Sequence, residues 1–188
     1  MHGSHICQLY WMLWELIMDG IHEDAINFIS KLSTMDIDTW WKYVTSNESY
    51  KNHQSIIFNK ISYHAILSGR RDLLQLMINN GFNVNSEDSF GIKPIFMTIQ
   101  RISVSGISLL GVMKDLISYG AFINCEDKSS GLTPLMWSMN EDALAHFVIL
   151  LNSGADVFYE SKIMKINSIE YAIKKRYYSK ISIMREFI

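Results

Sequence analysis

Residues 69–88 read GRRDLLQLMINNGFNVNSED, and residues 111–127 read GVMKDLISYGAFINCED. Aligned on Gly81 and Gly120, both stretches have an apolar helical pattern, then the glycine, then a hydrophobic residue followed by Asn-x-x-Asp. A third copy ends in residues 147–157, which read FVILLNSGADV. The glycine in each copy predicts the end of a helix. Because self-similarity of this kind is the signature of stacked units, we expect a repeat architecture.

The copies also share a turn and a helix start. Residues 91–95 read GIKPI and residues 131–135 read GLTPL. Asp88 and the glycine that follows it are turn residues, because glycine adopts positive φ at little cost. Thr133 can cap a helix, and both prolines of the chain stand where a first helical residue needs no N–H. A turn followed by a helix is therefore expected in each copy.

This unit resembles the ankyrin repeat, a β-turn plus two antiparallel helices with a period near 33 residues. The resemblance implies an all-α solenoid of about five units with short β-hairpin loops, in a single domain of residues 1–188. The clear copies are residues 60–88, 89–127 and 128–157; residues 1–38 are a degenerate first unit, 39–59 an insertion loop with a helical piece, and 158–188 a capping unit. Extra residues in the second copy are placed at 103–108.

The composition excludes several classes of protein. With 48% hydrophobic and 19% charged residues the chain can bury a core, so it is not a disordered protein. A net charge of −2 provides no general attraction for nucleic acid. Residues 6–18 are apolar but too short to span a membrane, and we expect a buried helix there. Cys7 and Cys125 suggest neither a disulfide framework nor zinc, which favours the cytoplasm, with the nucleus as the alternative.

The 26 Ile against 7 Ala affect the expected packing. Ankyrin-like first helices favour small residue pairs, but here the corresponding positions hold Ile66, Thr98–Ile99, Ser138–Met139 and Ala172–Ile173. We expect bulky residues there to push neighbouring units apart or to force repacking, with the 11 Met filling gaps.

The sequence contains no enzyme motif. The six histidines show no HExxH and no metal-ligand spacing, and phosphate-binding glycine loops and GxSxG are absent. We therefore expect a protein that is not an enzyme and that uses no cofactor or metal. Its function is expected to be binding.

Charge is unevenly distributed along the chain. Residues 1–50 contain seven acidic and two basic residues, net −5, whereas residues 161–188 contain two acidic and seven basic residues, net +5. The basic end can be an ordinary solvated surface, or it can dock an acidic partner surface and speed the encounter.

The resemblance implies that a partner protein contacts the hairpin tips and the groove-facing positions of the first helices. In this sequence those positions are Ser89, Phe90, Ile92, Gln100, Arg101, Lys128, Ser129, Leu132, Asn140, Glu141, Tyr159, Lys174 and Lys175. Phe90 and Ile92 stand out because a tip usually carries polar residues, so they are either exposed or packed on the next tip. Trp137 is either an aromatic anchor in the groove or a core residue.

The resemblance extends to small ankyrin-type inhibitors of cyclin-dependent kinases and of NF-κB-like factors. It implies an interaction module, a regulatory subunit or stoichiometric inhibitor whose protein partner, a kinase for example, occupies the concave groove. One alternative is a viral or microbial ankyrin protein that modulates host signalling, suggested by the Ile, Asn, Lys and Tyr content. Another is a ubiquitin-ligase adaptor, which we expect less because residue 188 falls within the last helical pattern.

Overall fold

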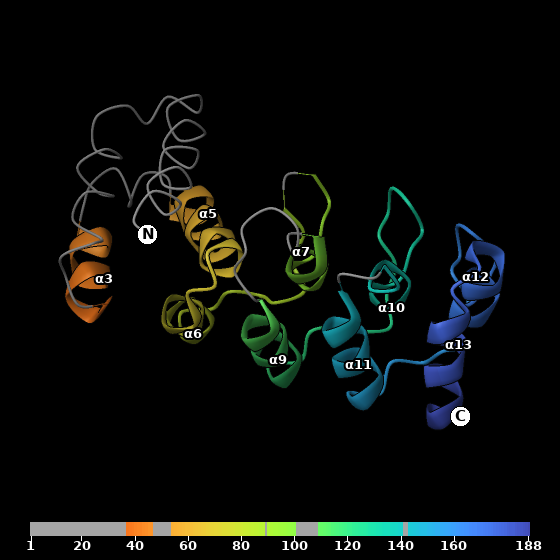
Figure 1. Ribbon diagram of the computed structural model, residues 1–188. Helices are drawn as coiled ribbons and strands as arrows, with labels where there is room; N and C mark the ends of the chain where they lie inside the picture. The colour runs from red at the N-terminus through yellow and green to blue at the C-terminus, as the bar shows by residue number, and fades with distance from the viewer. Residues whose placement is uncertain (1–36, 47–53, 89, 101–108, 141–142) are drawn as a thin grey trace. The chain divides into compact units, whose positions relative to one another are not determined.

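The computed structural model describes residues 37–46, 54–88, 90–100, 109–140 and 143–188 (Figure 1). All regular structure in these ranges is helical, which confirms the expected all-α class, and none of the residues in them forms a β-strand. The expected β-hairpin loops are therefore turns within the described ranges. The chain groups into two compact units, unit 1 ending at Phe82 and unit 2 running from Asn83 to Ile188, and the single domain expected over residues 1–188 stays a prediction.

Unit 1 contains helices α3 (Ile37–Ser46), α5 (Gln54–Leu67) and α6 (Arg71–Asn79). The loop expected over residues 39–59 is largely helical where it is described, since α3 continues to Ser46 and α5 begins at Gln54. No glycine or proline occurs from Ile37 to Leu67, so no residue there strongly interrupts a helix. The degenerate unit expected at residues 1–38, with its buried helix, lies almost wholly outside the described residues.

The packing in unit 1 follows from one apolar face of α6. Leu73, Leu74 and Met77 on this face are buried, and α6 contacts α5. The rings of Tyr63 and Phe82 meet edge to face with their centroids 5.7 Å apart. Burying a side chain of this size contributes roughly 1.5–3 kcal/mol, so these few contacts are enough to hold the two helices together.

The described residues of unit 2 form three helix pairs, two of them followed by a turn. The elements are α7 (Pro94–Gln100), α9 (Leu110–Ser118), α10 (Pro134–Trp137), α11 (Leu144–Asn152), α12 (Ser168–Lys175), α13 (Tyr178–Met184) and the 3₁₀ helix η2 (Arg185–Phe187). The pairs in contact are α7 with α9, α10 with α11, and α12 with α13. In addition, α10 contacts both α7 and α12, and α11 contacts α9, so the pairs lie side by side within unit 2 (Figure 1).

The helix starts in unit 2 confirm the predicted caps. α7 and α10 begin at the two prolines, and the Thr133 hydroxyl accepts a hydrogen bond from the Met136 N–H at 3.1 Å. The third start has no proline. There the Asn167 side chain accepts the N–H groups of Ile169 and Glu170, while the Glu170 carboxylate accepts the Asn167 N–H. This reciprocal capping box replaces the proline signal at α12.

The predicted helix ends are also confirmed. Gly81, Gly120 and Gly154 have φ values of +99°, +85° and +89°, and each follows a helix. At each site the glycine N–H and the next N–H donate back to carbonyls of the last turn, for example from Gly120 to Ile117 and from Ala121 to Leu116. This arrangement is the Schellman motif, which satisfies carbonyls that a helix end otherwise leaves unpaired. After α12 the same position is occupied by Arg176, at φ +62°.

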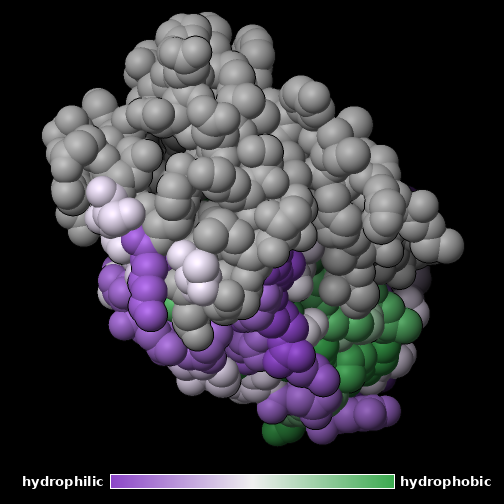
Figure 2. Space-filling view, turned by 90° about the vertical axis from the view of Figure 1, so that its left-hand side faces the viewer, coloured by the Kyte–Doolittle hydropathy of each residue, from purple (hydrophilic) through white to green (hydrophobic). Residues whose placement is uncertain are grey.

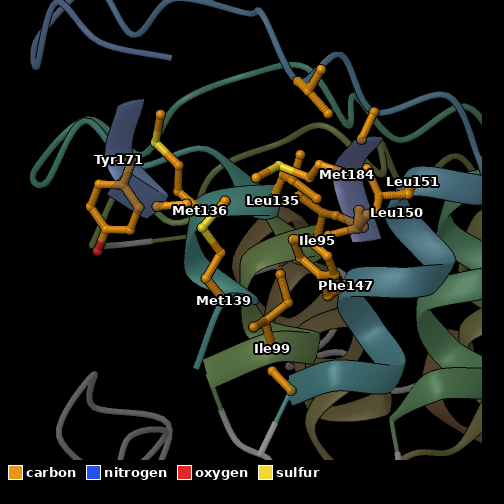
Figure 3. Packing of buried hydrophobic residues seen from close by; sticks show 14 of the residues in the cluster. Ile95, Ile99, Leu135, Met136, Met139, Phe147, Leu150, Leu151, Tyr171 and Met184 are labelled. Carbon is orange, nitrogen blue, oxygen red and sulfur yellow. The ribbon is translucent and has the colours of Figure 1, made fainter. Parts of the chain in front are cut away.

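The core of unit 2 combines side chains from all three pairs. Ile95 of α7, Leu135 of α10, and Phe147 and Leu150 of α11 are almost completely buried and point toward one another (Figure 3). Met184 of α13 belongs to the same cluster (Figure 3). One continuous apolar cluster therefore holds the pairs of unit 2 together.

The close contacts between first helices depend on small residues. Thr98, Ser138 and Ala172 are fully buried, and the two hydroxyls donate to the carbonyls of Ile95 and Leu135 three residues earlier in the helix. Of the bulky second residues, Ile99 and Met139 are also buried, whereas Ile173 is exposed. The expectation that bulky residues push neighbouring units apart or force repacking stays a prediction.

Two asparagines tie each helix end to the preceding turn segment. Asn85 donates from Nδ2 to the Gly120 carbonyl at 3.0 Å and accepts the Phe122 N–H at 2.7 Å. Asn124 accepts the Asp156 N–H at 2.9 Å, and its Nδ2 lies 3.4 Å from the Gly154 carbonyl. The aligned asparagines of the sequence thus make the same two bonds.

Candidate interaction surface

The first turn of unit 2 presents an exposed aromatic ring on a fixed backbone. The Asp88 carboxylate accepts the N–H groups of Phe90 and Ile92 at 2.9 and 2.8 Å. The backbone closes the turn through Asp88 and Ile92, and Gly91 takes φ +79°. The Phe90 side chain is 75% exposed, so within the described residues it does not pack on the next tip. Ser89 lies outside the described residues.

Ile92, two residues further on, behaves differently. Its side chain is half-buried and packs against the core cluster of unit 2, as does that of Leu132 at the corresponding position of the second turn. The sequence placed Phe90 and Ile92 together on the binding surface. The structure separates them, because alternate residues of a closed turn point to opposite sides of it.

The second turn is organised by a buried carboxylate. Asp127 accepts hydrogen bonds from the hydroxyls of Ser129 and Ser130 and from the Ser130 N–H. Burial by itself raises the pKa of Asp127, but the bonds from Ser130 and Ser129 outweigh burial and lower the pKa below its usual value. Asp127 therefore stays ionised at neutral pH. The exposed Ser129 is consequently held by this turn.

The third turn places Ser161 where the others have aspartate. Its hydroxyl accepts the Met164 N–H and donates to the Glu126 carboxylate at 2.9 Å, and Glu126 also accepts the Lys162 N–H at 2.8 Å. Lys165 takes the positive φ, +56°, that glycine takes in the other turns. Glu126 thereby ties the second turn segment to the third turn.

The first and second turns are tied by a carboxylate as well. Glu87 accepts bonds from Lys128 Nζ at 2.7 Å and from Lys93 Nζ at 3.1 Å. The hydrogen bond from Lys128, followed by that from Lys93, lowers the pKa of Glu87. Lys128, predicted as a contact residue, is exposed but its charge is already partnered by Glu87.

Trp137 lies between the two predicted roles. Its ring is half-buried and packs edge on against Phe96, with centroids 5.5 Å apart, and Nε1 lies 3.5 Å from the Ser130 hydroxyl. These contacts with the core of unit 2 favour the interpretation as a core residue. Trp137 therefore connects the second turn, through Ser130, to the core of unit 2.

The remaining predicted residues are spread out. Asn140, Lys174 and Lys175 are exposed, and Tyr159 is half-buried. Arg101 and Glu141 lie outside the described residues, as does the side chain of Gln100.

Sequence reasoning missed several exposed apolar side chains. Phe122, Phe158, Ile163, Ile173 and Tyr178 are all exposed. Figure 2 shows one face of the molecule, where a hydrophobic area of described residues lies beside hydrophilic ones. The sequence signal for Phe122 was the alternation of buried and exposed side chains after a helix-ending glycine. Ala121, directly after Gly120, is buried, so the next side chain, Phe122, is exposed.

His146 and Cys125 also have shifted pKa values. Burial lowers the pKa of His146, the nearby Thr98 carbonyl opposing it only in part, and neither ring nitrogen has a hydrogen-bond partner among the described residues. Burial raises the pKa of the Cys125 thiol to about 11, and its Sγ lies 3.2 Å from the Phe122 carbonyl. Cys125 is therefore protonated and unreactive at neutral pH.

Comparison with known protein families found no family model that matches the chain. The described residues contain no group of His, Cys, Asp and Glu that could hold a metal ion. Among the described helices, none is long and apolar enough to cross a membrane.

Proposed function

We propose that the chain is a non-enzymatic protein-interaction module built of ankyrin-like units. It acts as a regulatory subunit or stoichiometric inhibitor, and it binds a partner protein, a kinase for example, in a concave groove lined by its turn tips and adjoining first-helix positions. This proposal rests on the local structure of unit 2 and on the sequence resemblance.

Three recurring features support stacked ankyrin-like units. The turns at 88–92, 127–132 and 161–166 are closed by corresponding backbone bonds, and the helices preceding them end in the same motif. Asn85 and Asn124 make equivalent bridges over a sequence separation of 30 to 37 residues. That separation is close to the period of the ankyrin repeat.

The observation that carries the binding function is the exposure of Phe90. Moving a ring of this size out of water is energetically favourable, and binding in a pocket of a partner would provide that free energy. The Asp88 bonds hold the turn in one conformation, so little conformational entropy is lost when the partner docks. A rigid turn with an exposed aromatic ring is suited to recognition.

The test begins with proximity cross-linking in the native cell to identify the partner. The affinity of the purified partner is then measured for the wild type and for Phe90→Ala. We expect Phe90→Ala to weaken binding by about tenfold or more, as for an aromatic hot spot, with an unchanged Tm.

Phe122→Ala is the matched control, because Phe122 is 60% exposed in the same unit but is not part of the closed turns 88–92 and 127–132. Equal losses of affinity in both variants would contradict the proposal, and so would a fall in the Tm of Phe90→Ala. Ile92 is left unchanged, since it contributes to the core.

A further inference from the structure

The end of α12 and the start of α13 form an exposed surface of mixed character. It consists of Ile173, Lys174, Lys175, Arg176 and Tyr178, which we call the basic corner. The two apolar side chains are 55% and 65% exposed, and all three cations are exposed. Because these residues are nearly consecutive, they lie close together at one place.

The three cations of the basic corner have no ion-pair partner among the described residues. By contrast, Lys93 and Lys128 both form ion pairs with the Glu87 carboxylate. The carboxylate closest in sequence, that of Glu170, is occupied by the Asn167 N–H in the capping box. The positive charge of the corner is therefore not balanced by any carboxylate of the described residues.

The structure also shows which basic side chains near this end of the chain are exposed and so can contact a partner. Lys180 is buried, with its Nζ 5.1 Å from the centroid of the Phe147 ring, so it is not available to a partner. The exposed cations of residues 161–188 are Lys162, Lys165, Lys174, Lys175, Arg176 and Arg185. Only two exposed carboxylates, Glu170 and Glu186, lie in the same range.

Arg176 is the most informative residue of the corner. It has φ +62° in the same helix-end motif in which α5, α6, α9 and α11 have glycine. A side chain in this left-handed conformation opposes local stability, so glycine would be the more stable choice. Strained residues of this kind cluster at functional sites, where another role compensates for the strain.

We propose that the basic corner binds an acidic segment of the partner protein, with Ile173 and Tyr178 as apolar anchors and the three cations as electrostatic guides. This inference rests on the proposed function, because it assumes a protein partner. Two copies do not pair corner to corner, since that contact would bring like charges together. A segment of Asp and Glu residues around a bulky apolar side chain complements both parts of the surface.

The probe is a fluorescein-labelled peptide in which Asp and Glu residues flank a Trp and a Leu, and binding to the full chain is followed by anisotropy. The test variant is Lys174→Glu with Lys175→Glu. The control variant is Lys42→Glu with Lys114→Glu, which changes two other exposed lysines and shifts the net charge from −2 to −6 in the same way. We expect the test variant to lose about tenfold in affinity, and the control to change little.

Salt and strain give further readouts. The wild-type affinity should fall steeply between about 50 and about 300 mM salt, and that dependence should largely disappear in the test variant. Arg176→Gly should weaken binding and yet raise the Tm by about 2–4 °C, because it removes the left-handed strain. Tyr178→Ala should weaken binding without changing its salt dependence.

Three results would overturn the inference. The first is an equal loss of affinity in the control variant. The second is an Arg176→Gly protein that binds the peptide as tightly as the wild type. The third is tighter binding of phosphatidylserine vesicles or of single-stranded DNA than of the peptide, lost in the same test variant. None of these results bears on Phe90→Ala, so the proposed function can stand when this inference fails.

Discussion

Gly131 tests whether the second and third turns lie against each other. A Cβ atom added at Gly131 would be 2.7 Å from Ile163 Cβ and 3.0 Å from Met164 Cγ, in addition to a strained φ of +70°. At the equivalent residue of the first turn, Gly91, φ is +79° and a Cβ would meet nothing within 4 Å. Gly131→Ala and Gly91→Ala therefore share the backbone strain and differ only in the steric overlap.

The magnitudes follow from these distances. The left-handed conformation costs alanine about 1–2 kcal/mol, partly offset by about 0.4–1 kcal/mol from the less flexible unfolded chain. Gly91→Ala should therefore lower the free energy of unfolding by about 1 kcal/mol. A carbon–carbon distance of 2.7 Å is about 1 Å inside optimal contact, and overpacking of this kind costs about 1–3 kcal/mol more at Gly131.

The third turn cannot easily move away, because its Ser161 hydroxyl and Lys162 N–H donate hydrogen bonds to Glu126 of the second turn segment. Urea denaturation followed by far-ultraviolet circular dichroism measures both variants, with the m-value checked for constancy. Adding Ile163→Gly removes the contacting atom and should recover most of the excess in a double-mutant cycle. Equal costs at Gly131 and Gly91 would show that the two turns do not touch.

Three further predictions use the same denaturation measurement. Asn124→Ala should lower the free energy of unfolding by about 1–2 kcal/mol because it strands the Asp156 N–H, whereas Asn152→Ala, which breaks only a bond within its own helix, should cost under about 0.5 kcal/mol; similar costs would refute the bridge. Burial lowers the pKa of His146 in the folded state, so below about pH 6.5 the unfolded chain binds more protons at this residue than the folded chain does. The free energy of unfolding should therefore be independent of His146 above about pH 6.5 and should decrease as the pH falls, by at most about 1.4 kcal/mol per pH unit. His146→Leu should make the free energy of unfolding less dependent on pH in this range. An unchanged pH dependence would show that other groups cause it. Thr133→Ala should cost about 1 kcal/mol and Thr133→Ser much less, and equal losses would show that the cap is not the cause.

Features that depend on the backbone alone could be predicted from the sequence. Gly120 and Pro134 each suit one kind of position, a left-handed helix end and a first helical residue, so a local pattern was enough. The start of α12 has neither signal. It depends on the reciprocal bonds of Asn167 and Glu170, which also occur in many other contexts.

The surface could be predicted only in part, because exposure depends on what packs on each side chain. Phe90 and Ile92 look alike in sequence, yet one is exposed and the other supports the core. Lys180 lies in a run of basic residues, but contact with Phe147 buries it. These differences arise from contacts between residues far apart in the chain, which no local pattern contains.

The asparagine bridges have a consequence for how this surface can change over time. Opposite the asparagine each bridge uses only backbone groups: for Asn124 these are the Gly154 carbonyl, which accepts, and the Asp156 N–H, which donates. Such a bridge requires one particular side chain on one of the two segments and none on the other. The exposed positions beside each bridge, Phe122 among them, can therefore exchange freely while the architecture persists, so new recognition properties can evolve, or be engineered, without rebuilding the scaffold.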